Sequence, residues 1–451
     1  MTKKIRMRIS VIPGIALVLV AALLAPPAYA ASGLQWFRGQ MHTHTYWSDG
    51  RAFPEQAIEA YKERGYHFLC LSDHNRFESN TDYWCQLAAE EGGWPPKVTH
   101  EMFDAYVLSC GEDWVETRTE GDNTFVRIKT YAEVKPRYEE PGQFLLIPGV
   151  EITQTLNGYA IHQNYINIPA VLPSIVGAPL SQKLEGEMTP AELLQQNSTE
   201  ARQTAAELQV PYLYMVNHPF WVYYDVVPQN LLDCPEIRFF EICNGGSEFA
   251  PHPQAESYTP DKFWDVVNAF RRIQGQDFLY GVGSDDAHFY DVKRIDQNDG
   301  VGDAWVMVRA QSLTPEHLLA ALNQGDFYAT TGVLLDDVAF TPADKTLRVK
   351  VKPEEGATYR IHFITTKQGF DPTMTEVASP AEERRPARNV PVYSEDIGRV
   401  VKTVDGTEAE YTLEEGDLYV RARIESNIPG KFTRHFHPDT LTAWTQPYAA
   451  E

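Results

Sequence analysis

The sequence predicts an α/β fold with a largely parallel sheet, followed by an all-β region. Short apolar runs alternate with amphipathic helical segments from Trp36 to about Gly332, which is typical of parallel strands connected by helices. After Gly332 the apolar period becomes two, which is typical of strands without intervening helices. The 451 residues, of which 43% are hydrophobic, suffice for a large domain and a smaller one. We therefore expect one domain over 31–332 and a β-sandwich-like accessory domain over 333–451.

The first thirty residues are expected to be a secretory signal peptide. The basic stretch MTKKIRMR precedes the apolar run VIPGIALVLVAALLA, and Ala28–Ala30 has the small-x-small pattern of a cleavage site. The apolar run is short and is interrupted by Pro13 and Gly14, which disfavours a membrane span, with a single N-terminal anchor as the alternative. We expect an exported protein, periplasmic or secreted, with no membrane attachment after cleavage.

The charge balance restricts the class of partner. Loss of the segment 1–30 removes four basic residues and no acid, which changes the formal net charge from −23 to −27. Such a surface repels long polyanions, so we expect no nucleic-acid polymer as a partner. A small anionic substrate is compatible with this charge if the site itself is cationic. The sequence gives no indication of the oligomeric state.

The strand-like runs of the first domain each end in polar residues. In chain order they are WFRGQMHTH, YHFLCLSDH, FLLIPGVEIT, YLYMVNHP, RFFEICNG and FLYGVGSDDAH. Two of the helices have clear boundaries: one begins at Pro54 and ends at Gly65, and another follows Thr314 and ends at Gly325.

Residues 75–142 interrupt this alternation. The segment is polar, has no clean period and contains three tryptophans. We interpret it as an insertion, which either shapes a substrate site or forms a peripheral subdomain. Cys85 and Cys110 fall within it, and in an oxidising compartment they could form a disulfide.

The region after Gly332 has the alternation of half-buried strands. LRVKVK places Leu347, Val349 and Val351 on one face, and the runs YRIHFI and LYVRARI follow the same pattern. These runs predict the strands of the accessory domain.

Metal-binding side chains follow the strands of the first domain. His42 and His44 lie at positions i and i+2, so one strand end can present both to one ion. Each of these side chains alone has an ordinary role in a strand, but in a (β/α) barrel all the strand ends meet at one rim. The candidate ligands are His42, His44, Asp49, His74, Glu151, His162, His218, Asp286 and His288. Since one ion needs about four ligands, nine predict two or three divalent ions, with Glu151 as a bridge. Nitrogen and oxygen donors without cysteine suit Zn, Mn or Fe.

A second histidine pair occurs at His435 and His437 in RHFHP. It has no companion motif, and we interpret it as a surface strand end. Four further polar residues at the strand ends are candidates for supporting the ligands or for protonating a leaving group, with ordinary strand-end hydrogen bonding as the alternative: Asp73, Asn217, Asn244 and Asp285.

The motifs HTHTxxSDG, SDHN, PGxEIT, NHP and GSDDAH, in this order, resemble those of the polymerase and histidinol phosphatase (PHP) superfamily over roughly residues 36–332. The resemblance implies a distorted (β/α)7 TIM-like barrel with a trinuclear metal site. GDFYATTG, the β region and AWTQP resemble, more loosely, the exported branch named after carbaryl (N-methylcarbamate) hydrolases.

The same resemblance implies a ligand set for each ion. Asp49 stands where several members of the superfamily have histidine, which would change the preferred metal. By motif, the first ion would take His42, His44, Glu151 and Asp286, the second Asp49, His74 and His288, and the third Glu151, His162 and His218.

The sequence therefore predicts an exported, multinuclear, metal-dependent hydrolase. It contains no GxSxG nucleophile elbow and no P-loop. The resemblance implies a phosphoesterase that acts on a small phosphate mono- or diester through metal-bound hydroxide. Three divalent ions would outweigh the charges of Asp49, Glu151 and Asp286, which favours a small substrate with a phosphate over a polymer. Hydrolysis of a carbamate, ester or amide at the same metals is the alternative. A metal-containing binding protein without turnover is a third hypothesis.

Overall fold

The computed structural model of the chain describes residues 33–90, 92–221, 225–247, 255, 257–290, 300–381, 386–430 and 438–450. The predicted signal peptide, residues 1–30, and the second histidine pair, His435 and His437, lie outside these residues. Among the helices described, none is long and apolar enough to cross a membrane.

Seven neighbouring strands of one sheet carry the strand ends singled out in the sequence. β1, β2 and β7 are parallel to one another, and so are β10, β11 and β12. β8 lies between the two groups and is antiparallel to both of its neighbours. In sheet order the strands are β1 (Gln35–Gln40), β2 (Phe68–Leu71), β7 (Leu145–Leu156), β8 (Tyr159–Ile166), β10 (Leu213–Val216), β11 (Phe239–Asn244) and β12 (Tyr280–Ser284).

The sheet is thus mixed, where the sequence analysis expected a largely parallel one. The α/β class is as predicted, but β7 returns directly as β8 through a tight turn and not through a helix. Asn157 and Gly158 occupy this turn with φ angles of 50° and 89°. An Asn-Gly pair with positive φ at both positions favours a two-residue hairpin, so TLNGYA contained the signal for this antiparallel pair.

The carboxyl ends of the first and last of these seven strands meet. Thr43, after β1, forms a parallel bridge with Ala287, after β12, and the His44 amide donates to the Ala287 carbonyl at 3.0 Å. The hydrogen-bonded strand order is otherwise an open path. A closed (β/α)7 barrel therefore stays a prediction.

Three of the helices begin with a proline directly after a threonine, at Pro190, Pro260 and Pro315. Thr259 and Thr314 accept a hydrogen bond from the third helical residue, which satisfies an amide that would otherwise lack a partner. The predicted boundaries at Pro54 and Gly325 are confirmed. Apart from one further helix described below, the helices are α2 (Pro54–Glu63), α4 (Tyr131–Tyr138), α5 (Pro190–Leu208), α6 (Pro228–Leu232), α7 (Pro260–Ile273) and α8 (Pro315–Gln324). A 3₁₀ turn, η1 (Pro173–Ile175), and a short strand, β9 (Gln182–Leu184), which pairs with β7, lie between β8 and α5 in the chain.

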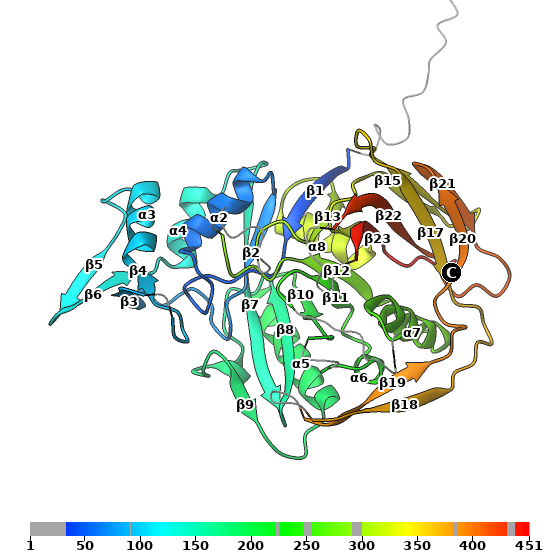
Figure 1. Cartoon of the computed structure of the whole chain (residues 1–451), viewed down its shortest axis with the longest axis horizontal. Coiled ribbons are helices and arrows are strands. Elements are labelled where there is room, and N and C mark those ends of the chain that lie inside the picture. The colour runs from blue at the N-terminus through cyan, green and yellow to red at the C-terminus, as the bar shows by residue number, and fades with distance from the viewer. Residues whose placement is uncertain are drawn as a thin grey trace, which may run out of the picture. The chain divides into compact units, whose positions relative to one another are not determined.

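In addition to α4, the insertion contains a small four-stranded sheet of its own with one helix (Figure 1). Its elements are β3 (Trp84–Ala88), β4 (Val98–Thr99), α3 (His100–Cys110), β5 (Thr117–Glu120) and β6 (Asn123–Arg127). Tyr106 of α3 stacks on Phe53, with ring centroids 3.7 Å apart, which anchors the insertion beside α2. Cys85 and Cys110 are both buried and free, so the predicted disulfide is not formed.

The region after residue 332 consists of strands, as predicted. Leu347, Val349 and Val351 are buried along one face of β16, in agreement with the alternation. The strands of this region are β15 (Leu335–Thr341), β16 (Thr346–Val351), β17 (Tyr359–Thr365), β18 (Met374–Ser379), β19 (Arg388–Tyr393), β20 (Arg399–Asp405), β21 (Glu408–Thr412), β22 (Arg421–Pro429) and β23 (Thr440–Thr445), and they follow β13 (Trp305–Ala310) and β14 (Phe327–Thr330), which precede residue 332.

This region is continuous with the first sheet. β13 pairs with β1, β14 with β13, and β23 with β14, after which β22, β17 and β20 follow. The fully buried Arg421 of β22 joins Asp265 of α7 through two hydrogen bonds, from Nε to Oδ1 at 2.8 Å and from Nη2 to Oδ2 at 2.6 Å. The proposed boundary near residue 332 is therefore crossed by both a ladder and a buried ion pair.

Candidate metal centre

The nine candidate ligands lie together at the edge of the sheet to which the carboxyl ends of the parallel strands point, and the antiparallel β8 brings His162 to this edge from its amino-terminal half. They form three groups whose ligand atoms lie within 4.8 Å of one another. The groups are His42, His44 and Asp286; His44, Asp49, His74 and His288; and Glu151, His162 and His218. Residues separated by almost 250 positions in the sequence thus share one site.

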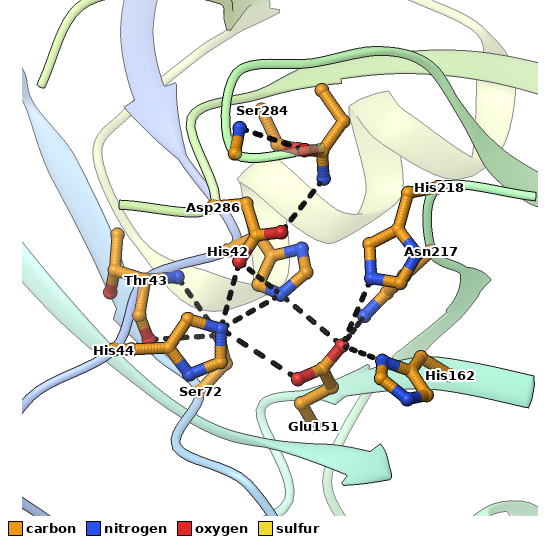
Figure 2. Close-up of polar contacts among 12 residues, drawn as sticks. His42, Thr43, His44, Ser72, Glu151, His162, Asn217, His218, Ser284 and Asp286 are labelled. Atoms are coloured by element: carbon orange, nitrogen blue, oxygen red, sulfur yellow. Dashed lines mark hydrogen bonds and ion pairs between the residues drawn. The ribbon is translucent and has the colours of Figure 1, made fainter. Parts of the chain in front are cut away.

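The first group converges on a single carboxylate oxygen. Oδ1 of Asp286 lies 2.9 Å from Nε2 of His44 and 3.2 Å from Nε2 of His42. The two Nε2 atoms are 3.1 Å apart, and Figure 2 shows both imidazoles directed at the Asp286 carboxylate. Both histidines are fully buried. Two imidazole nitrogens and one carboxylate oxygen facing a common point are donors suited to a divalent transition metal.

The Glu151 carboxylate lies between the first group and the third. Its Oε1 is 3.3 Å from Nδ1 of His162 and 3.5 Å from Nε2 of His218. The same carboxylate is 3.4 Å from Nε2 of His42 and 3.7 Å from Nε2 of His44 (Figure 2). A carboxylate with donors on both sides is placed to bridge two ions.

The remaining group is gathered around Asp49. Oδ1 of Asp49 lies 3.3 Å from Nε2 of His74, and Oδ2 lies 3.2 Å from Nε2 of His288. Nδ1 of His44 is 3.8 Å from Asp49 Oδ1, so His44 faces this group with one nitrogen and the first group with the other. The resemblance implied His44 for the first ion alone.

These groups form a buried set of opposite charges. Burial opposes charge on His42, but the carboxylates of Asp286, Glu241 and Glu151 raise the pKa of this imidazole well above its usual value. Burial likewise opposes charge on Glu151, yet the imidazoles of His74, His42 and His162 hold the pKa of Glu151 well below its usual value. Because only a neutral imidazole can ligate, a divalent ion bound here would displace protons from histidine.

The donor set fits divalent metal ions. Nδ1 of His162 is buried, makes no hydrogen bond within the described residues and lies 3.3 Å from Glu151 Oε1. A lone pair aimed into a shared space beside a carboxylate is what a metal ligand requires. The ions that the sequence predicts would be held by these three groups.

Glu241 of β11 is a site residue that the sequence analysis missed. Its Oε1 lies 2.8 Å from Nδ1 of His42, the nitrogen opposite the one that faces Asp286. Its Oε2 accepts hydrogen bonds from the backbone amide of His218 at 2.7 Å and from Nδ2 of Asn244 at 2.7 Å. Such a carboxylate orients a ligating imidazole and makes it more basic. The residue stands in the run RFFEICNG, three positions before Asn244 at the end of β11, and its place in a strand of the site was the available signal.

Two of the four supporting candidates contact the ligands. Nδ2 of Asn217 donates to Glu151 Oε1 at 2.8 Å, and Nδ2 of Asn244 lies 3.3 Å from Asp286 Oδ2. Both amides hold a ligand carboxylate in place, and Asn244 also joins Asp286 to Glu241.

Asp73 and Asp285 make the strand-end hydrogen bonds that the sequence analysis gave as the alternative. The Asp73 carboxylate accepts from the amide and the hydroxyl of Thr45, at 2.7 and 2.8 Å. The Asp285 carboxylate accepts from the amides of Gly302, Asp303 and Ala304, at 2.9, 2.7 and 2.9 Å. These contacts fix the loops on either side of the ligands and leave neither carboxylate directed at a metal group.

The backbone of the site is held in unusual conformations. His218 and Asp286 have φ angles of 22° and 50°, a region that L-residues rarely adopt. Gly246 packs on Asp286 so closely that an added Cβ would lie 2.7 Å from its carbonyl oxygen. Strained residues of this kind cluster at functional sites, where the surrounding structure compensates for the cost.

Comparison with known proteins gives only distant likenesses. No family model matches the sequence, and no curated protein matches it.

Among solved structures, a two-domain protein from Bacteroides vulgatus that contains a predicted PHP-like metal-dependent phosphoesterase is 13% identical, with 93% of this chain and 95% of that chain covered and a TM-score of 0.40. A proposed metal-dependent phosphoesterase from Bifidobacterium adolescentis is 12% identical, with 56% and 88% covered and a TM-score of 0.28. An amidohydrolase from Chromobacterium violaceum, solved with sulfate and no metal, is 12% identical, with 55% and 87% covered and a TM-score of 0.27. At these scores the likenesses assign neither a family nor a reaction to this chain.

Proposed function

We propose that the chain is a multinuclear metal-dependent hydrolase of the PHP type, and that it cleaves a small phosphate mono- or diester. The observation that carries the proposal is the position of the Glu151 carboxylate between two imidazoles. Its Oε1 lies 3.4 Å from Nε2 of His42 and 3.3 Å from Nδ1 of His162. A carboxylate shared by two groups of imidazoles is the arrangement of a multinuclear centre. The proposal rests on these residues, because the solved structures above are too distant to assign a reaction.

The nine ligands would hold two or three ions, and Zn, Mn and Fe suit their nitrogen and oxygen donors. Divalent ions at this site would lower the pKa of a water molecule and neutralise the oxygens of a phosphoryl group. The residues of the chain hold the metal ligands in position. Asn217 holds the Glu151 carboxylate, Asn244 holds Asp286, and Glu241 holds His42. A site fixed in this way loses little free energy to rearrangement when charge develops on the substrate.

The substrate preference follows from charge. Three divalent ions would outweigh Asp49, Glu151, Asp286 and the additional carboxylate Glu241, so the site would be cationic within a chain of net charge −23. This contrast favours a small anionic substrate over a nucleic-acid polymer. We further propose that the protein is exported, on the basis of the basic, apolar and small-residue pattern of residues 1–30.

Hydrolysis of a carbamate, ester or amide at the same metals is the second candidate, since ions that neutralise a phosphoryl group can also polarise a carbonyl. The looser resemblance to the carbaryl-hydrolase branch is its motivation.

Metal analysis combined with a substrate panel tests the proposal. The purified protein should contain at least two divalent ions per chain and should hydrolyse p-nitrophenyl phosphate or its bis-ester faster than an aryl N-methylcarbamate. Chelation should abolish turnover at a concentration that leaves the circular dichroism unchanged, and the added metal should restore it. The reverse order of rates would favour the second candidate, and a metal-loaded protein without turnover on any substrate would favour a binding protein.

A further inference from the structure

Two tryptophans from different parts of the chain flank the metal ligands. Trp94, in the insertion, lies with its ring centroid 5.7 Å from that of His74. Trp221, which follows β10, lies 5.4 Å from His162 and 5.3 Å from His218. His74 and His162 are themselves neighbours, with ring centroids 6.0 Å apart. The two indoles therefore lie beside the same part of the site, the part that contains His74 and His162.

Among the described residues, Trp94 is largely exposed and Trp221 is partly exposed. Trp94 is 54% exposed, which is unusual for a large apolar side chain placed beside buried charges. Neither indole N–H donates a hydrogen bond within the part of the chain that the structure describes. The indole N–H groups of six of the nine tryptophans do have acceptors: Trp36, Trp47, Trp84, Trp114, Trp264 and Trp444.

A role in holding the imidazoles in place does not by itself explain why Trp94 and Trp221 lie beside them. His74 is already positioned by Thr153, whose Oγ1 lies 2.5 Å from its Nδ1, and by Asp49 at its other nitrogen. Trp94 is tilted by 46° to His74, and Trp221 is tilted by 46° to His162, so neither indole lies flat on its imidazole. An indole held at an angle beside a ligand retains a face for another ring.

We propose that Trp94 and Trp221 bind a planar, apolar group attached to the scissile group, so that the substrate is an aryl ester and not a small alkyl ester. This inference rests on the proposed hydrolase function and deepens it. The metals would take the anionic part of the substrate, and the indoles would take the ring, with their N–H groups free to donate to an oxygen on it. The insertion, which carries Trp94, would then set the specificity of the site.

A binding experiment tests the inference without turnover. The metal-loaded protein is titrated calorimetrically with phenylphosphonate and with methylphosphonate, neither of which is a phosphoester. Each aromatic contact of this kind contributes about two- to tenfold, so two predict that the phenyl compound binds at least about fourfold more tightly. Trp94→Ala and Trp221→Ala should each reduce this preference about two- to tenfold, and Trp94→Phe should retain most of it. Leu108→Ala, at a residue 88% exposed on α3 of the same insertion, is the matched control and should leave the preference unchanged.

Metal content separates a specificity role from a structural one. The tryptophan variants should keep the metal content of the wild type, and a loss of metal in Trp94→Ala would assign the indole to support of His74 and overturn the inference. Equal binding of the two phosphonates by the wild type would also overturn it.

The kinetic arm separates this inference from the proposed function. In it, kcat/KM for phenyl phosphate should exceed that for ethyl phosphate, and Trp221→Ala should narrow the difference. Turnover of both esters at equal rates would overturn the inference that the tryptophans bind an aryl group, and it would still agree with the proposed hydrolase function. Selective binding of phenylphosphonate without hydrolysis of any phosphoester would contradict the proposed reaction and support the tryptophan site.

Discussion

Nδ1 of His42 lies 2.8 Å from Oε1 of Glu241, while Nε2 of the same imidazole lies 3.2 Å from Asp286 Oδ1. One ring thus joins a supporting carboxylate to a ligand carboxylate. The contact fixes which nitrogen of His42 carries the proton when the other ligates, and it links β11 to a site whose other residues come from neighbouring strands.

Glu241→Gln should therefore weaken metal binding without removing a ligand. The neutral amide cannot increase the basicity of His42 as the carboxylate does, and loss of such a partner typically costs 10–100-fold in metal affinity. Competition with a chromophoric chelator measures the change. Glu410→Gln, an exposed residue on β21, is the control and should bind metal as the wild type does. Unchanged affinity in Glu241→Gln would show that the contact is structural only.

Glu151→Gln should lower the metal content by at least one ion per chain. The substitution preserves shape and removes the charge that His42 and His162 share. Inductively coupled plasma mass spectrometry on the purified variant gives the count. His435→Ala, in the histidine pair outside the described residues, should leave both metal content and rate unchanged. A loss of metal in that variant would mean that the wrong histidine pair was identified as the ligand pair.

Glu78→Gln should stabilise the protein, and increasingly so as the pH rises. Burial, together with the neighbouring Asp73 carboxylate, raises the pKa of Glu78 well above its usual value. Between these two pKa values the folded state holds a proton that the unfolded state has released. Ionisation of Glu78 therefore costs no stability at low pH, and the free energy of unfolding falls as the pH rises above about 4.5, up to the raised pKa. Each unit of that difference is worth about 1.4 kcal/mol. Urea denaturation of the wild type and the variant from pH 4 to pH 8, with a chelator present, should give curves that diverge in this direction, and parallel curves would contradict the prediction.

Arg421→Met should destabilise the fold. The fully buried guanidinium binds Asp265, and its Nη2 lies 2.8 Å from Oδ1 of Asp261. Removal of one partner from a buried ion pair leaves an uncompensated charge, which costs about 3–5 kcal/mol. The midpoint of chemical denaturation measures the loss. Arg399→Met, in an exposed pair with Asp396 at 3.7 Å, should change stability by less than about 1 kcal/mol.

The sequence indicated the residues that the structure brings together at the candidate metal centre, because most of them lie in local strand-end motifs. His42 and His44 lie at positions i and i+2 of one extended segment, and Asp286 and His288 repeat that spacing. Residues i and i+2 of a strand lie on the same face whatever the order of the strands in the sheet. These residues could therefore be named as candidates before the strand order was known.

Other features depend on tertiary context. The Asn157–Gly158 hairpin reverses β8, and a single Asn-Gly pair within an otherwise α/β pattern was outweighed by the helical segments around it. Glu241 was missed because a single acid in an apolar run has no periodic partner. Its role appears only when β11, which also carries Asn244, is placed beside β12, which leads to Asp286.

The position of β23 has a consequence for biosynthesis. This strand, Thr440–Thr445, lies between β14 and β22, and the side chain of the following Gln446 bonds both the amide and the carbonyl of Gly281 in β12, each at 2.9 Å. Gln446 thus occupies hydrogen-bonding groups on the strand that leads to Asp286. Until residues 440–446 have docked, the amide and the carbonyl of Gly281 lack this partner. A newly made chain should therefore bind metal less tightly before β23 has docked than after it.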